Sequence, residues 1–179
     1  DVKKLDIENE ATKFEVDTLN FAKKIGFIKK LCDGTKTKRV SGITVADNLE
    51  IKTRTGSTQI DCIAVYQNTI FVIECKYTAN KDGKYQGLAT QITKHHERVR
   101  DFKNVLTDSS LRKKNREADI GKFEDGKWEK NMDVVGVFAL KNVILTDDLK
   151  RKMKQKKFVD SWDDDFFKYY DDLRKKILQ

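Results

Sequence analysis

The chain has 179 residues, 37% of them charged, and a formal net charge of +8. This length favours one domain with a sizeable core, and the mixture of acidic and basic residues excludes a disordered polycationic tail. A basic domain either binds polyanions, nucleic acid first among them, or carries a lysine-rich surface without a partner, and charge alone supports both interpretations equally. No run approaches the ~20 apolar residues of a membrane span, and no secretory signal opens the chain. We therefore expect a cytoplasmic protein with no membrane partner.

The three cysteines, Cys32, Cys62 and Cys75, form neither a CxxC pair nor an even disulfide set. We expect all three to be reduced, which suits the cytosol. The chain begins at Asp1 rather than at a methionine, which is typical of a trimmed protein or a piece of a larger one. We predict a single domain over residues 1–179, with a core over about 8–145 and C-terminal helices over 147–179.

The first half of the chain alternates between helical and extended patterns. Apolar residues at helical spacing predict a helix over residues 7–26, with Gly26 as its stop. Residues 38–54 predict two short extended pieces, one of them a strand. Residues 58–66 and 69–78 predict an antiparallel hairpin with a tight turn at Gln67-Asn68.

The second half begins with a helix predicted from about Tyr85 to Leu106. The polar residues 107–132, with Gly121 and Gly126 among many charges, predict a long loop, and Val134 to Leu140 predicts a buried strand. Thr146 is typical of a helix N-cap, for a helix that runs to about Lys157. Helical spacing returns from Ser161 to Leu178 in an aromatic stripe, which we interpret as core or a subunit interface.

The predicted hairpin carries charges where apolar residues are expected. Glu74 follows the run Ile70 to Ile73, and Lys76 lies two residues further on. Side chains on a strand alternate between faces, so Glu74 and Lys76 point the same way, with Asp61 on the neighbouring strand. A structural ion pair at a sheet end is the plain alternative, but it leaves the position of Asp61 unexplained.

The functional interpretation is a site for a divalent cation. Asp61 and Glu74 would hold Mg²⁺ or Mn²⁺ through oxygen ligands, together with the backbone carbonyl of Cys75. Such an ion stabilises negative charge on a phosphate and lowers the pKa of a bound water. Lys76 would orient that water or neutralise the transition state. This is the chemistry that hydrolysis of a phosphodiester requires.

These residues carry a family resemblance. Ile60-Asp61 followed by Glu74-Cys75-Lys76 resembles the motif of the PD-(D/E)xK, or restriction-endonuclease-like, nucleases, with Ile60 in place of their proline. The stretch Ala11 to Glu15 resembles the first helix of the Mrr-like and Holliday-junction-resolvase-like branches. The resemblance covers roughly residues 8–140. It implies an α/β fold with a central mixed sheet of four to five strands flanked by helices (αβββαβ), followed here by C-terminal helices.

The resemblance also implies roles for two further residues. Glu15 would help to hold the metal, usually through water. Gln91, on the helix after Lys76, would contact the phosphate or support the lysine, although a plain surface amide is an equal alternative and Gln86 competes for the same role. Among the basic residues, Lys94, Arg98, Lys113 and Lys114 are candidates for binding the nucleic-acid backbone, against the alternative of a solvated face.

The expected activity is that of a Mg²⁺-dependent endodeoxyribonuclease, which hydrolyses DNA phosphodiester bonds in restriction, phage defence or repair. One alternative is a catalytically silent nuclease-like module that binds nucleic acid or serves assembly. Another is a nuclease that acts on RNA or branched DNA. A homodimer, or a further target-recognition domain or subunit, is compatible with each of these.

Overall fold

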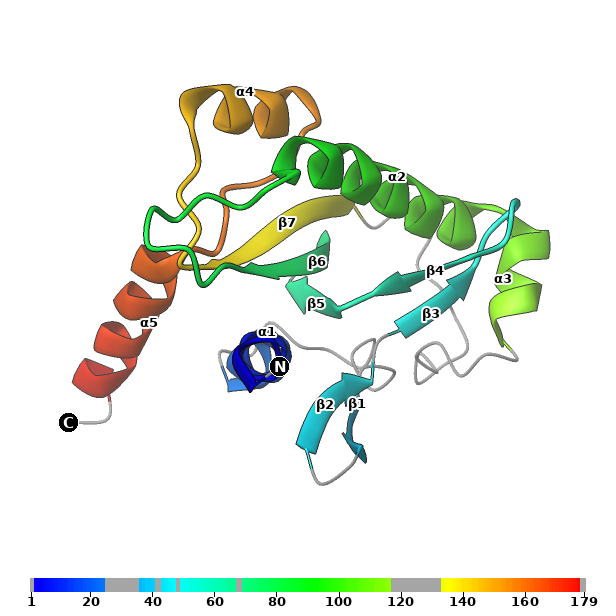
Figure 1. Cartoon of the computed structure of the whole chain (residues 1–179). Coiled ribbons are helices and arrows are strands. Elements are labelled where there is room, and N and C mark those ends of the chain that lie inside the picture. Colours follow the sequence, from blue (N-terminus) through cyan, green and yellow to red (C-terminus); the bar gives the residue numbers. More distant parts are fainter. Residues whose placement is uncertain are drawn as a thin grey trace.

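The computed structural model describes residues 2–24, 36–40, 43–47, 49–66, 69–116 and 133–177. Figure 1 shows these elements around a small central sheet. They are, in chain order, α1 (Val2–Lys24), β1 (Lys36–Val40), β2 (Ile43–Asp47), β3 (Leu49–Lys52), β4 (Ser57–Ile60), β5 (Cys62–Tyr66), β6 (Thr69–Tyr77), α2 (Leu88–Thr107), α3 (Ser109–Arg116), β7 (Asp133–Lys141), α4 (Asp147–Gln155) and α5 (Asp164–Ile177).

The central sheet has the order β5-β6-β7 and is mixed. Strands β5 and β6 are antiparallel with Tyr66 opposite Thr69, which confirms the predicted hairpin. Its turn residues, Gln67 and Asn68, lie outside the described residues. Strands β6 and β7 are parallel, with Glu74 opposite Phe138.

The sheet is smaller than expected: the described strands that pair in it number three, not four to five. The strand predicted over residues 58–66 is broken at Asp61, so that β4 pairs with β3 while β5 pairs with β6. The β5–β6 ladder ends at Cys62 opposite Ile73. At the next step the Asp61 carboxylate accepts a hydrogen bond from the backbone N–H of Cys75, at 2.9 Å. The Asp61 side chain thus accepts a hydrogen bond from the β6 backbone just beyond the end of the β5–β6 ladder.

Two separate hairpins precede the sheet. Strand β1 pairs with β2, and β3 pairs with β4. Two extended pieces with one strand were expected over residues 38–54, whereas this region contains parts or all of three strands. Short extended runs of this kind acquire strand geometry only through their pairing partners, which a local pattern does not show.

Alternation along β6 assigns its side chains to two apolar layers. Phe71, Ile73 and Cys75 pack with α1, through Phe14 and Leu19, and with the α5 region. Ile70 and Val72 instead pack against α2. By the same alternation, Glu74 and Lys76 face α2. Figure 1 shows α2 running across the sheet, with α1 and α5 on the other side.

The helices differ from the predictions mainly at their ends. Helix α1 begins at Val2 rather than residue 7, and its expected stop, Gly26, lies outside the described residues. Helix α2 begins at Leu88 because Gly87 before it has a left-handed backbone (φ 74°). The predicted N-cap of α4 is confirmed, since the Thr146 side chain accepts a hydrogen bond from Leu149 N.

Two predictions for the second half were wrong in part. The region predicted as a loop over 107–132 contains α3, whose first turn is capped by the Asp108 carboxylate through Ser110 N and Leu111 N. The remainder of that loop, residues 117–132, lies outside the described residues. Trp162 was expected in the last helix, but it forms an isolated parallel bridge to Ala139 and is buried.

Phe166 and Phe167 of α5 are partly buried and pack against the core, whereas Tyr169 is exposed. Phe167 packs edge-on against Phe14 and Phe21 of α1, with ring centroids 5.9 Å and 4.8 Å apart. Cys62 and Cys75 are buried thiols, while Cys32 lies outside the described residues. No helix in the described ranges is long and apolar enough to cross a membrane.

Candidate functional site

The site is built on the last residues of β6. Lys76 Nζ lies 3.0 Å from Glu74 Oε1, so the two side chains do point the same way. Glu74 is only 6% exposed. Burial by itself lowers the pKa of Lys76. The charge of Glu74 and the hydrogen bond to Glu74 raise it, so that the pKa lies above the ordinary value. Lys76 is therefore a positive charge and a hydrogen-bond donor, not a proton acceptor.

Asp61 reaches the same end of the hairpin from the bend between β4 and β5. It is buried, and one of its oxygens is held by Cys75 N. Burial, followed by the charges of Glu74 and Glu15, raises its pKa to about 8. The nearby Lys76 only partly offsets these effects. The ionised form of Asp61 is therefore disfavoured in the protein alone, and a bound cation would favour it.

Glu15 comes from α1, on the other side of the sheet edge. It is half-buried, and burial followed by the charge of Glu74 raises its pKa. Glu15, Asp61, Glu74 and Lys76 therefore form one electrostatic group. They come from three segments of the chain: α1, the bend between β4 and β5, and β6. Within the described ranges, however, no three His, Cys, Asp or Glu side chains lie close enough to ligate one ion together.

Helix α2 contributes two residues that contact Glu74. Arg98 Nη1 lies 3.4 Å and His95 Nδ1 lies 4.0 Å from Glu74 Oε2. Arg98 was expected to bind nucleic acid from the helix surface, but its guanidinium turns into the site and is only 22% exposed. The three-residue spacing of His95 and Arg98 places both on the helix face toward the sheet.

Sequence reasoning missed the place of His95 in the site. His95 is completely buried, and its Nε2 donates a hydrogen bond to the Val72 carbonyl at 2.9 Å. Burial lowers its pKa to about 4, so the ring is neutral. The signal was present: His95 falls within the apolar stripe of α2 between Ile92 and Phe102, where a solvated histidine is not expected.

The remaining candidates lie at or beyond the rim. Gln91 is half-buried one turn before His95, and its backbone N–H donates a hydrogen bond to Gly87 O. Gln86 is exposed before the start of α2. Tyr85 was not predicted, and Lys76 Nζ lies 5.8 Å from the centroid of its ring. The predicted nucleic-acid-binding lysines are exposed: Lys94 on α2, and Lys113 and Lys114 on α3.

Comparison with known proteins supplies an independent observation. The model of the nuclease-related domain family matches residues 26–169, which is most of the chain. The chain belongs to the nuclease-related domain family. This membership indicates a nuclease-like function, in agreement with the expected class of chemistry. No curated protein and no solved structure matches the chain.

The extent of the family match separates the site residues into two groups. Asp61, Glu74, Lys76 and the α2 residues lie inside the matched segment, whereas Glu15 on α1 lies before its first residue. Glu15 thus joins the site through packing of α1 against the nuclease-related segment.

Proposed function

We propose that this nuclease-related domain is a Mg²⁺- or Mn²⁺-dependent endodeoxyribonuclease of the PD-(D/E)xK type, nearest to the Mrr-like and Holliday-junction-resolvase-like branches. The observation that carries the proposal is the buried group of Asp61, Glu74 and Lys76 at the end of the β5–β6 hairpin. Restriction, phage defence or repair in the cytoplasm is the setting that this activity suggests.

The residues present fit a divalent cation. An aspartate whose pKa is raised to about 8 by burial and by two neighbouring carboxylates is stabilised in its ionised form when a cation is bound. Mg²⁺ characteristically uses one or two carboxylates and keeps several waters, so three close protein ligands are not required. Asp61, Glu74 and the Cys75 carbonyl would hold the ion, with Glu15 acting through water. The bound ion would supply charge stabilisation at the phosphate and a water of lowered pKa.

The side chains of the site divide the remaining tasks. Lys76, kept protonated by Glu74, orients the attacking water or stabilises charge on the phosphate in the transition state. Neutral His95 fixes the position of α2 over the sheet through its hydrogen bond to the Val72 carbonyl. Gln91, half-buried on the same helix face, would contact the phosphate once substrate is bound.

One observation favours a second candidate function. Both oxygens of Glu74 already have a basic partner, Lys76 on one and Arg98 on the other. An ion cluster that is complete without metal is what a catalytically silent module for nucleic-acid binding or assembly would retain. A test must therefore separate cleavage from binding.

The test is cleavage of plasmid and linear DNA with Mg²⁺ or Mn²⁺ by the wild type, Asp61→Asn and Lys76→Ala. We expect metal-dependent cleavage that falls by about 10²–10³-fold in each variant. Asp61→Asn removes a carboxylate that would hold the cation, and Lys76→Ala removes a positive charge that would face the reacting phosphate. Glu50→Gln, which changes an exposed carboxylate on β3, is the matched control and should cleave like the wild type. Single-stranded RNA and a four-way DNA junction in parallel assays identify the substrate class.

Cleavage that survives in both variants would place the activity elsewhere. Absence of cleavage on every substrate, together with intact DNA binding, would support the silent module instead.

A further inference from the structure

Glu74 Oε2 faces two nitrogen atoms that make no hydrogen bond. Arg98 Nη1 and His95 Nδ1 are both buried, and neither has a hydrogen-bond partner. Their distances to Glu74 Oε2 are 3.4 Å and 4.0 Å. Glu74 Oε1, by contrast, has a short contact of 3.0 Å with Lys76 Nζ. The two oxygens of one carboxylate are thus held unequally.

Of the two cationic partners of Glu74, Arg98 makes the longer contact. A buried guanidinium nitrogen without a hydrogen bond is energetically unfavourable, since it has lost water and gained only a long ion pair. The planar guanidinium of arginine prefers an anion with two oxygens that accept two parallel hydrogen bonds, and a phosphate group provides these oxygens. The Arg98 side chain is 22% exposed, so an anion at the surface of the site can reach it.

The position of Arg98 also affects metal binding. A divalent cation at Glu74 Oε2 would lie beside the guanidinium, and the two positive charges repel each other in a partly buried site. Arg98 and the metal therefore compete for the same carboxylate oxygen. Lys76 does not compete in this way, because it contacts the other oxygen.

We propose that Arg98 couples DNA binding to metal binding. In the free protein it neutralises Glu74, and in the complex it turns to a DNA phosphate beside the scissile bond and releases Glu74 Oε2 for the divalent cation. The inference rests on the proposed nuclease function and assigns one of its substrate contacts. Because coupling between two ligands is reciprocal, DNA raises the affinity for metal and metal raises the affinity for DNA by the same factor.

The test is calorimetric titration with Ca²⁺, an oxygen-binding cation, with and without a saturating short DNA duplex whose integrity is checked on a gel. In the wild type we expect DNA to raise the affinity for Ca²⁺ by roughly 5–150-fold, the usual range of coupling between sites. In Arg98→Gln we expect tighter Ca²⁺ binding without DNA and a smaller enhancement with it. Arg100→Gln, which loses the same charge from an exposed position on α2, is the control and should behave like the wild type.

Arg98→Lys separates charge from geometry. It keeps a cation beside Glu74 but lacks the planar fork of donors. We expect its affinity for Ca²⁺ without DNA to match the wild type, and the enhancement by DNA to be reduced. Circular dichroism checks that each variant is folded. If Arg98→Gln does not fold, the comparison of Arg98→Lys with the wild type tests the coupling.

Equal affinities and equal enhancement in the wild type, Arg98→Gln and Arg98→Lys would overturn the coupling while metal-dependent cleavage by the wild type still stood. A wild type that binds no Ca²⁺ even with DNA, and that cleaves no DNA with Mg²⁺ or Mn²⁺, would instead overturn the proposed function and the coupling together.

Discussion

At the scale of single residues, Asp61 shows how a common side chain acquires unusual chemistry. Asp61 lies next to the end of the β5–β6 ladder. Its carboxylate accepts a hydrogen bond from Cys75 N and is buried near Glu74 and Glu15. Burial and these two charges raise its pKa from 3.8 to about 8. The folded protein therefore holds a proton on Asp61 at neutral pH that the unfolded chain releases.

This shift predicts the pH dependence of stability without metal. A raised pKa contributes stability that is fully present below about pH 4 and is lost as the pH rises to about 8. Asp61→Asn does not titrate and keeps an oxygen for Cys75 N. We expect its melting temperature at pH 8 in EDTA to exceed that of the wild type by at least about 4 °C, or roughly 1–2 kcal/mol for a chain of this size.

The measurement is thermal unfolding between pH 4 and pH 9. The difference between the two proteins should shrink toward pH 4, and Mg²⁺ at pH 8 should stabilise the wild type but not the variant. Parallel curves across the range would show that Asp61 titrates normally.

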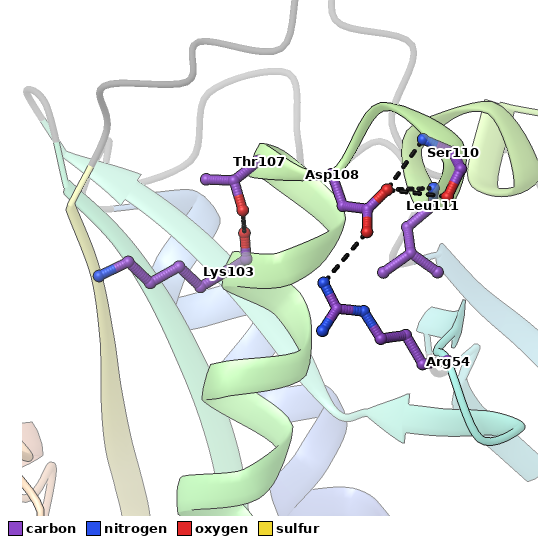
Figure 2. Close-up of polar contacts among 6 residues, drawn as sticks. All are labelled: Arg54, Lys103, Thr107, Asp108, Ser110 and Leu111. Carbon is purple, nitrogen blue, oxygen red and sulfur yellow. Dashed lines mark hydrogen bonds and ion pairs between the residues drawn. The ribbon is translucent and has the colours of Figure 1, made fainter.

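At the scale of elements, α3 joins the β3–β4 hairpin to the end of α2. The Asn115 side chain accepts a hydrogen bond from Lys52 N at 2.8 Å and donates one to Lys52 O at 3.0 Å. Asn115 thus pairs with the edge of β3 as a neighbouring strand would. Figure 2 shows a second link, in which Arg54 of the hairpin contacts Asp108, the residue that caps α3, at 3.1 Å.

The two links should differ in their contribution to stability. Asn115 is completely buried, so Asn115→Ala leaves Lys52 N and O without partners and should cost about 1–3 kcal/mol. Arg54→Gln breaks an exposed ion pair and should cost no more than about 1 kcal/mol. Chemical denaturation measures both, with the exposed neighbour Lys114→Ala as control. Equal costs for the two variants would contradict this ranking.

At the scale of the whole molecule, α2 connects the site to the region where α3 meets the β3–β4 hairpin. Figure 1 shows α2 passing from the sheet to α3 beside the β3–β4 hairpin. Arg98 and the end of α2 at Thr107 are nine residues apart, or about 14 Å along a helix. Lys113 and Lys114 on α3 are exposed beyond that end. A DNA strand bound at the site could therefore meet them a few phosphates away from the scissile bond.

We expect the double variant Lys113→Gln/Lys114→Gln to bind duplex DNA more weakly at every sequence. The slope of its log affinity against log salt concentration should be smaller in magnitude by about 2, because two phosphate contacts are lost. Fluorescence anisotropy in EDTA measures the slope, at salt concentrations from roughly 50 to 200 mM, where the affinity depends strongly on phosphate contacts. Lys150→Gln/Lys154→Gln, on exposed positions of α4, removes the same charge and should leave the slope unchanged. Equal slopes for both double variants would exclude a role for the α3 lysines.

Local pattern was sufficient for much of this protein. Helical spacing located α1 and α2, alternation located the β5–β6 hairpin, and the apolar run located β7. The same alternation predicted that Glu74 and Lys76 share a face, which their 3.0 Å contact confirms. These features depend on residues close together in the chain, and a periodic pattern records them directly.

Only the tertiary structure decided the surroundings of Glu74. The break at Asp61 depends on a hydrogen bond to a residue 14 positions away, and Arg98 enters the site because α2 packs across β6. Glu15 joins the group because α1 packs against the other layer of the sheet. Sequence spacing supplies the charged side chains, but the pKa and the ion-pair partners of each depend on burial and on charges brought near by packing, which no local pattern contains.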